Sequence, residues 1–149
     1  MRVSRRELGL ILPAIAAISA SARAQTPAAP RVKLTTSKNY HHDKIPYDGD
    51  DTKKARRFFT GETHGGFNLE VHETILGAGV QTHAPHQHVH EEIIVVVEGT
   101  VETFVDGKTE VLETGSVIYY GSNQMHSLRN VGRTRARYYV VELRGDESV

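Results

Sequence analysis

The sequence contains no cysteine, which excludes disulfide bonds, thiolate metal sites, a cysteine nucleophile and a lipoprotein anchor. Neither sign of charge is in surplus, because 18 Lys and Arg residues balance 18 Asp and Glu residues. The basic residues are scattered, so the basic face that nucleic acid requires is not expected. Long apolar runs are also lacking. Residues 9–20 are short, Ala-rich and interrupted by Pro13, which argues against a stable membrane anchor.

The first residues carry the pattern of a twin-arginine signal peptide. Residues 4–8 are Ser-Arg-Arg-Glu-Leu, the short apolar stretch follows, and residues 22–24 form a small-x-small cleavage site. An uncleaved anchor or a general secretory signal is the alternative. Cleavage near Ala24 would leave 14 basic and 17 acidic residues. We therefore expect an exported, periplasmic protein, whose mature chain of about 125 residues is long enough for one domain.

Two regions follow the expected signal peptide at residues 1–24. Residues 25–57 are rich in Pro, Asp and Lys without a sustained period, which predicts an irregular linker or arm that packs on the domain or on a partner subunit. The adjacent His41 and His42 would point in opposite directions on an extended arm, which favours a surface role. Residues 58–149 are expected to form a single β-barrel domain.

From Phe67 onward the sequence predicts an all-β fold. Short segments of alternating polarity recur at near-regular spacing with turn residues between them, which is typical of a sandwich or barrel. Asp106-Gly107 lies between two such segments and predicts a type I′ hairpin turn. The expected strands cover residues 67–76, 86–97, 100–105, 108–112, 116–120, 125–130 and 135–143.

Histidines gather immediately before the most apolar Val/Ile segment of the chain. His86, His88 and His90 have the i, i+2 spacing that places side chains on one face of a strand, and Glu92 extends the same face. His126 would join them once the sheet curls over. Three imidazoles and one carboxylate leave one or two metal positions for water or substrate, as in a reactive site. A solvated patch of surface histidines is the alternative.

Two segments resemble the sequence motifs of the cupin superfamily. Residues 79–99 are Gly-x6-His-x-His-x3-Glu-x6-Gly, and residues 115–130 are Gly-x5-Gly-x-Asn-x2-His-x3-Asn. The resemblance covers roughly residues 66–143. It implies a cupin-type jelly-roll β-barrel, preceded here by the signal peptide and the irregular arm. It also implies a metal site whose ligands are His86, His88, Glu92 and His126.

The motifs depart from the usual pattern at three positions. Gly79 lies one residue further from His86 than is usual, and Gly121 and Asn123 replace a family proline and glycine. Asn is the non-glycine residue that best tolerates a left-handed backbone, so the turn at Asn123 is expected to form. All four implied ligands are present.

The signal peptide bears on the identity of the metal. Twin-arginine export carries folded proteins, so a metal can be bound in the cytoplasm before envelope Cu²⁺ and Zn²⁺ outcompete it. We expect one divalent metal per chain, Mn²⁺ or Fe²⁺ in preference, with Zn²⁺, Ni²⁺ or Cu²⁺ as substitutes.

The resemblance implies a metal-dependent small-molecule enzyme, with dioxygenase, decarboxylase and isomerase chemistry all open. His90 is the candidate catalytic residue that would move protons, or a cavity tyrosine from the pair Tyr119 and Tyr120 would do so. The alternatives are a non-catalytic barrel that binds a small molecule or sugar in the same cavity, and a purely structural metal. The resemblance further implies a homodimer.

Three other features carry weaker predictions. His83 is expected at the surface, and the role of His72 is open because its direction on the strand cannot be assigned. Arg133, Arg135 and Arg137 alternate along a strand, which favours a solvated face over an anion-binding site.

Overall fold

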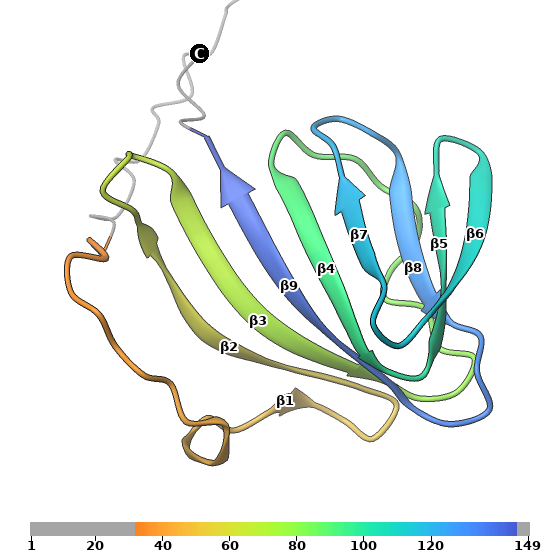
Figure 1. Ribbon diagram of the computed structural model, residues 1–149. Coiled ribbons are helices and arrows are strands. Elements are labelled where there is room, and N and C mark those ends of the chain that lie inside the picture. Colours follow the sequence, from red (N-terminus) through yellow and green to blue (C-terminus); the bar gives the residue numbers. More distant parts are fainter. Residues whose placement is uncertain (1–31, 146–149) are drawn as a thin grey trace, which may run out of the picture.

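The computed structural model describes residues 32–145 as two antiparallel β-sheets packed face to face (Figure 1). The expected signal peptide lies outside these residues. The large sheet has the order β1-β2-β3-β9-β4-β7, and the small sheet has the order β6-β5-β8. The strands are β1 (Asp48–Gly49), β2 (Lys53–Glu62), β3 (Asn68–Leu76), β4 (Glu91–Glu98), β5 (Thr100–Val105), β6 (Lys108–Glu113), β7 (Val117–Tyr120), β8 (His126–Asn130) and β9 (Ala136–Arg144).

The all-β prediction is confirmed, because the only helix among residues 32–145 is one 3-10 turn, η1 (His42–Lys44). The predicted strands from residue 67 onward correspond to β3 through β9. Side chains alternate between exposed and buried positions on β7, and between buried and half-buried positions on β9. No helix of the described residues is long and apolar enough to cross a membrane.

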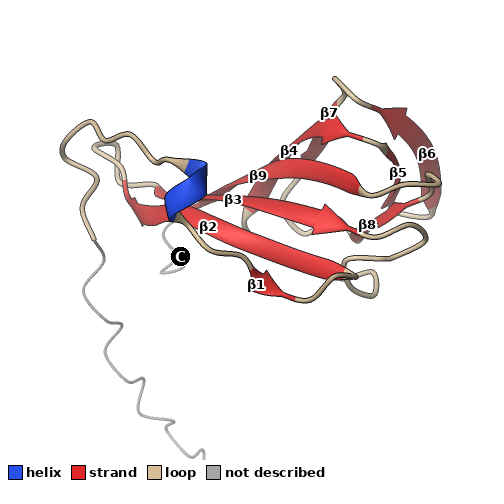
Figure 2. Ribbon diagram, turned by 90° about the horizontal axis from the view of Figure 1, so that it is seen from below, coloured by secondary structure: helices blue, strands red, loops and turns tan. Residues whose placement is uncertain are grey.

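The apolar core lies between the inner faces of the two sheets. Both sheets contribute to it, with Val96 and Tyr138 from the large sheet and Val101 and Leu128 from the small one, each no more than 2% exposed. The core residues come from β3, β4, β7 and β9 of the large sheet and from β5 and β8 of the small sheet, and Figures 1 and 2 show how these strands are arranged. The inner face also carries polar side chains.

Two turns have the backbone that the sequence predicts. Asp106 and Gly107 both have positive φ, 44° and 87°, as the type I′ turn between β5 and β6 requires. Asn123 has φ 58°, so it takes the left-handed conformation in the turn before β8. The second-motif turn therefore forms despite its departure from the family pattern.

The segment before β2 packs against the outer face of the large sheet. Tyr47 donates a hydrogen bond of 2.8 Å to Glu73, and the buried Arg56 both pairs with Glu73 and donates to the His42 carbonyl. The side chains of His41 and His42 are exposed, in agreement with the surface role favoured from the sequence. Strand β2 begins at Lys53, so the sheet includes residues that the sequence assigned to the arm.

Candidate metal centre

A loop that ends at β4 carries the clustered histidines. The sequence predicted one strand over residues 86–97, and this was wrong at its first residues, since β4 begins at Glu91. The loop is instead fixed by an isolated bridge, in which His86 and His126 exchange backbone hydrogen bonds of 3.1 Å and 2.8 Å. The first-motif histidines are thus tied to β8, the strand that carries the second-motif histidine.

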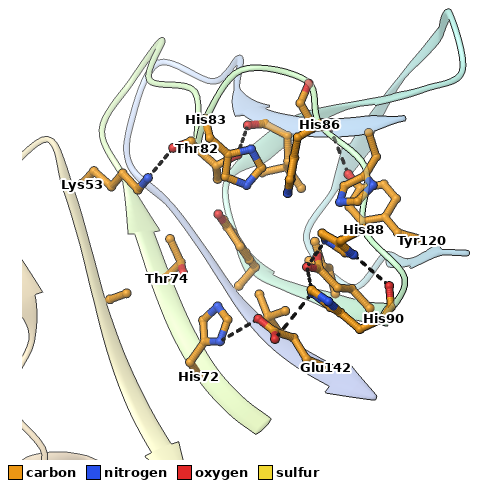
Figure 3. A pocket seen from close by; sticks show the side chains of 18 of the residues that line it. Lys53, His72, Thr74, Thr82, His83, His86, His88, His90, Tyr120 and Glu142 are labelled. Atoms are coloured by element: carbon orange, nitrogen blue, oxygen red, sulfur yellow. Dashed lines mark hydrogen bonds and ion pairs between the residues drawn. The ribbon is translucent and has the colours of Figure 1, made fainter. Parts of the chain in front are cut away.

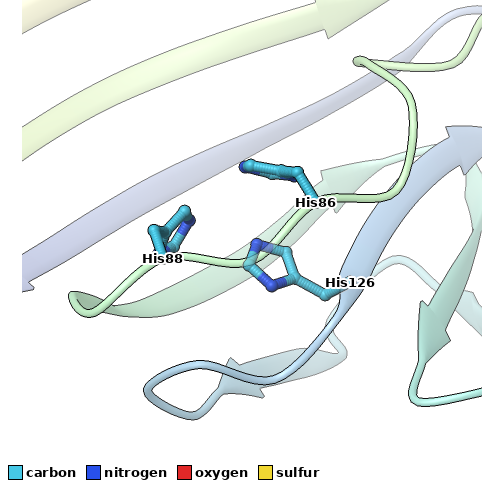
Figure 4. Close-up of side chains that lie close together, drawn as sticks. All are labelled: His86, His88 and His126. Carbon is cyan, nitrogen blue, oxygen red and sulfur yellow. The ribbon is translucent and has the colours of Figure 1, made fainter. Parts of the chain in front are cut away.

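Three imidazoles converge at this bridge (Figure 4). The ring of His86 lies 5.0 Å from that of His88, and both rings lie 4.7 Å from the ring of His126. One nitrogen from each ring lies within 4.8 Å of the other two, which is close enough for a shared ion. His86 and His126 are 40 positions apart in the sequence, and the fold brings them together with His88.

Backbone carbonyls fix the tautomers of two of these rings. His126 Nδ1 donates to the Gln124 carbonyl at 2.8 Å, and His88 Nδ1 donates to the His90 carbonyl at 2.9 Å. In each neutral ring the proton is therefore on Nδ1, which leaves a lone pair on Nε2. Both Nε2 atoms are buried and make no hydrogen bond to any described residue. Burial also lowers the pKa of His126, which favours the neutral, ligating form.

The carboxylate of Glu92 faces one of these nitrogens. Its Oε1 lies 3.1 Å from His88 Nε2, yet the pair does not have hydrogen-bond geometry. Two electron-rich atoms at this distance repel unless a cation lies between them or a proton is added. The residues present therefore fit a divalent metal held by His86, His88, Glu92 and His126, with imidazole and carboxylate ligands.

His90 lies beside this ligand set. Its ring stacks on that of His88, with centroids 3.4 Å apart and planes 5° apart. Its Nε2 lies 3.5 Å from Glu92 and 3.7 Å from Glu142. Burial, and then the neighbouring His88, lower the pKa of His90 and favour its neutral form.

A cavity of about 390 Å³ opens over the histidines, between the large sheet and the loop (Figure 3). Tyr120 lines it, whereas Tyr119 is 60% exposed on the opposite face of β7. The Tyr120 hydroxyl donates to the Ser127 carbonyl at 3.1 Å and accepts from Thr103 at 2.6 Å. Burial raises the pKa of Tyr120 to about 12, and its ring stacks on that of His126. Tyr120 therefore stays neutral, and its ring packs against the His126 imidazole.

The structure shows where the other candidate residues, His72, His83 and Arg135, lie. His72 projects from β3 into the cavity, together with Thr74. His83 is exposed as predicted, but its ring lies 4.0 Å from that of His86 at the cavity wall. Arg135 is exposed, so it matches the solvated face favoured from the sequence, and its ion pair with Glu98 measures 2.9 Å.

Two inward-facing carboxylates, Glu70 and Glu142, were missed by sequence reasoning, and Glu142 lines the cavity. Both are at least 91% buried on the inner face of the large sheet. Glu142 lies on β9 two residues after the buried Val140, and Glu70 lies two residues before His72. A polar residue at an inward position of a strand is the signal that could have found them.

Comparison with known proteins agrees with the fold. The family model for the cupin domain matches residues 72–142, while no curated protein matches the chain. Many solved structures are similar, and three of them are described below; at their identities they show the fold alone.

An RmlC-like cupin from Shewanella frigidimarina has TM-score 0.60 and 21% identity, over 74% of this chain and 95% of that one. A predicted oxalate decarboxylase from Thermotoga maritima has TM-score 0.60 and 16% identity, over 71% and 98%. The polyketide cyclase RemF from Streptomyces resistomycificus has TM-score 0.58 and 17% identity, over 76% and 88%. The family model thus identifies a cupin domain over residues 72–142, and the two facing sheets and these structural neighbours agree with the cupin fold.

Proposed function

We propose that this protein is a metal-dependent enzyme that acts on a small, oxygen-bearing molecule. One divalent metal, Mn²⁺ or Fe²⁺ in preference, would be held by His86, His88, Glu92 and His126. One observation carries the proposal. The Nε2 atoms of His88 and His126 are buried without a hydrogen-bond partner among the described residues, and the Glu92 carboxylate lies next to His88 Nε2.

The ligand count supports a reactive metal. Four protein ligands leave coordination positions open on Mn²⁺ or Fe²⁺, which favour six ligands, and the ligand nitrogens line the cavity. When bound, the metal would polarise a substrate oxygen and stabilise the negative charge that develops on it. Carboxylates, enolates and diols are the substrate groups that such a position accepts. Decarboxylation, isomerisation and oxygenolytic cleavage are the reactions that this chemistry serves.

His90 is the residue we assign to proton transfer. It lines the cavity, its burial favours the neutral imidazole, and Glu92 and Glu142 lie near its Nε2. A neutral imidazole can take a proton from substrate and the nearby carboxylates can stabilise the cation that results. Tyr120 has no such role, because its hydroxyl is already engaged with Ser127 and Thr103.

The same groups favour an enzyme over the alternative of a non-catalytic binding barrel. A barrel that only binds its ligand needs no titratable group beside the open metal position. This cavity instead contains His90, Glu142 and His72 next to the ligand set. Two structural neighbours, a predicted oxalate decarboxylase and a polyketide cyclase, are consistent with catalysis in this fold.

Export and pairing complete the proposal. We expect the chain to reach the periplasm as a folded protein after cleavage near Ala24, and to form a homodimer. Cell fractionation and light scattering on the mature protein test these two points.

Activity is tested with the full chain loaded with Mn²⁺ or Fe²⁺. Small carboxylates, 1,3-diketones and diols would be screened by NMR for products and by an electrode for O₂ uptake. His90→Gln is the informative variant, since it removes the proton carrier and leaves all four ligands. We expect turnover in the wild type, a loss of at least about tenfold in kcat for His90→Gln, and unchanged metal content. Saturable binding without turnover in the wild type would instead establish the binding barrel.

A further inference from the structure

The inner face of the large sheet carries three carboxylates in one cross-strand row. Glu70 on β3 lies opposite Glu142 on β9, and Glu142 lies opposite Glu92 on β4. Glu70 is 9% exposed, Glu142 is 8% exposed, and the side chain of Glu92 is 14% exposed. Like charges directly opposite one another in a sheet repel, and burial strengthens the repulsion. The row therefore needs positive charge between its members.

One imidazole, His72, lies close to two members of this row, and Figure 3 shows it facing Glu142. His72 Nδ1 is 3.3 Å from Glu70 Oε1 and 3.9 Å from Glu142 Oε1. This nitrogen is buried, and it makes no hydrogen bond within residues 32–145. His72 thus directs an unpartnered nitrogen at two carboxylate oxygens, an arrangement that a shared cation would complete.

Two arginines partly neutralise the negative charge of Glu70 and Glu142. Arg57 Nε lies 2.9 Å from Glu70 Oε1, and Arg144 contacts Glu142 through Oε2. The side chain of Arg57 is 63% exposed and that of Arg144 is 40% exposed, so water screens both pairs. Arg57 contacts the same Glu70 oxygen that faces His72. On Glu142, His72 faces Oε1 and Arg144 contacts Oε2.

We propose that Glu70, His72 and Glu142 hold a second divalent cation at the wall of the cavity that contains the metal centre. His72 and Glu142 line that cavity, and Glu70 lies next to His72. One ligand atom from each residue lies within 4.8 Å of the other two. A set of one imidazole and two carboxylates is harder than a set dominated by imidazoles, and hard oxygen ligands suit Mn²⁺. The second site is therefore assigned to Mn²⁺ or an ion of similar preference.

The second cation would make the charge of the cavity wall less negative. His90 lies between the two ligand sets, 3.5 Å from Glu92 of one and 3.7 Å from Glu142 of the other. Without a cation, the row of three carboxylates repels an anionic substrate. With one, that wall can receive an anionic group while the other end of the substrate meets the first metal. The inference does not depend on the proposed catalytic activity.

The test counts ions on the full chain. Chelator-treated protein is titrated with Mn²⁺ by calorimetry, and bound metal is measured by elemental analysis after desalting. We expect two ions per chain in the wild type and one in His72→Ala, Glu70→Gln and His126→Ala. His83→Ala is the matched control, because it removes a cavity histidine outside both sets, and it should retain two. Circular dichroism verifies the fold of each variant, and Glu70→Gln serves if His72→Ala does not fold.

Each outcome decides the proposal. A wild type that binds one ion, retained in both His72→Ala and Glu70→Gln, overturns the second site. Retention of two ions in both variants overturns it as well, and so does loss of both ions from a folded Glu70→Gln protein. One ion that survives His126→Ala but not Glu70→Gln supports the second site while contradicting the first. Absence of bound Mn²⁺ in the wild type contradicts both.

Discussion

His86 and His126 lie directly opposite each other and exchange two backbone hydrogen bonds, although no regular strand contains His86. The bridge fixes the positions of both imidazoles relative to one sheet. Metal ligands on rigid backbone lose little entropy on binding an ion. The pairing is the structural reason that two distant sequence motifs act as one site.

The Tyr120 hydroxyl is predicted to support the site without taking part in chemistry, because it is hydrogen-bonded to Ser127 and Thr103. Tyr120→Phe removes the bonds to Ser127 and Thr103 and leaves the buried Thr103 hydroxyl without that partner. We expect a loss of about 1–2 kcal/mol in the free energy of unfolding, measured by urea denaturation. Metal content and kcat should stay within about twofold of wild type. A large fall in kcat with metal retained would show that Tyr120 transfers protons after all.

The buried ion pair on the outer face of the large sheet is predicted to matter for stability. Arg56 and Glu73 have side chains 8% and 0% exposed, so Arg56→Ala leaves a buried carboxylate with less compensation. We expect a loss of about 3–5 kcal/mol in urea denaturation. Arg135→Ala is the control, since it breaks the exposed pair with Glu98 and should cost less than about 1 kcal/mol. Equal effects of the two variants would contradict this account.

Asn130, at the end of the second motif, joins three carbonyl groups. It is fully buried, and its amide nitrogen donates to the carbonyls of Leu76, Gly77 and Thr134. Asn130→Asp keeps the side-chain oxygen that accepts from Gly132 but loses the donors. We expect a loss of at least about 2 kcal/mol on thermal or urea unfolding. A change below about 0.5 kcal/mol would show that water satisfies these carbonyls instead.

The exposed Glu98 provides a pH-dependent prediction. A hydrogen bond from Arg135, followed by the charges of Arg135 and Arg137, holds the pKa of Glu98 below 4.5. A pKa lowered by folding stabilises the protein above the unfolded value, and that contribution is lost as pH falls through the folded pKa. In Arg135→Ala the pKa of Glu98, followed by NMR titration, should rise toward its ordinary value. An unchanged pKa would show that Arg137 alone is responsible.

The strands after residue 67 could be predicted from the sequence because their alternation and turns are local signals. Asp106-Gly107 specifies a hairpin by itself, because both residue types tolerate the positive φ that this turn requires. Strand β2 was not predicted, because Lys53–Glu62 has charged residues in pairs and no clean alternation. It becomes a strand by pairing with β3, and a bulge between Arg57 and Phe59 breaks its period.

The candidate metal ligands could be named from their spacing and from the cupin motifs, but their backbone conformation could not be predicted. The i, i+2 pattern of His86 and His88 suggested a strand, whereas the structure has a loop fixed by His126. Side-chain spacing does not distinguish a strand from an extended loop, since the two share similar φ and ψ. The inward Glu70 and Glu142 were missed because cross-strand register is a property of the whole sheet.

The central claim is that His86, His88, Glu92 and His126 hold one divalent metal. The most direct measurement is a crystal structure of the Mn²⁺-loaded full chain, with anomalous diffraction recorded at the Mn absorption edge. The account predicts a strong peak within about 2.3 Å of an imidazole nitrogen from each of the three histidines and of a Glu92 oxygen. A loaded crystal with no peak among these four side chains would contradict the account.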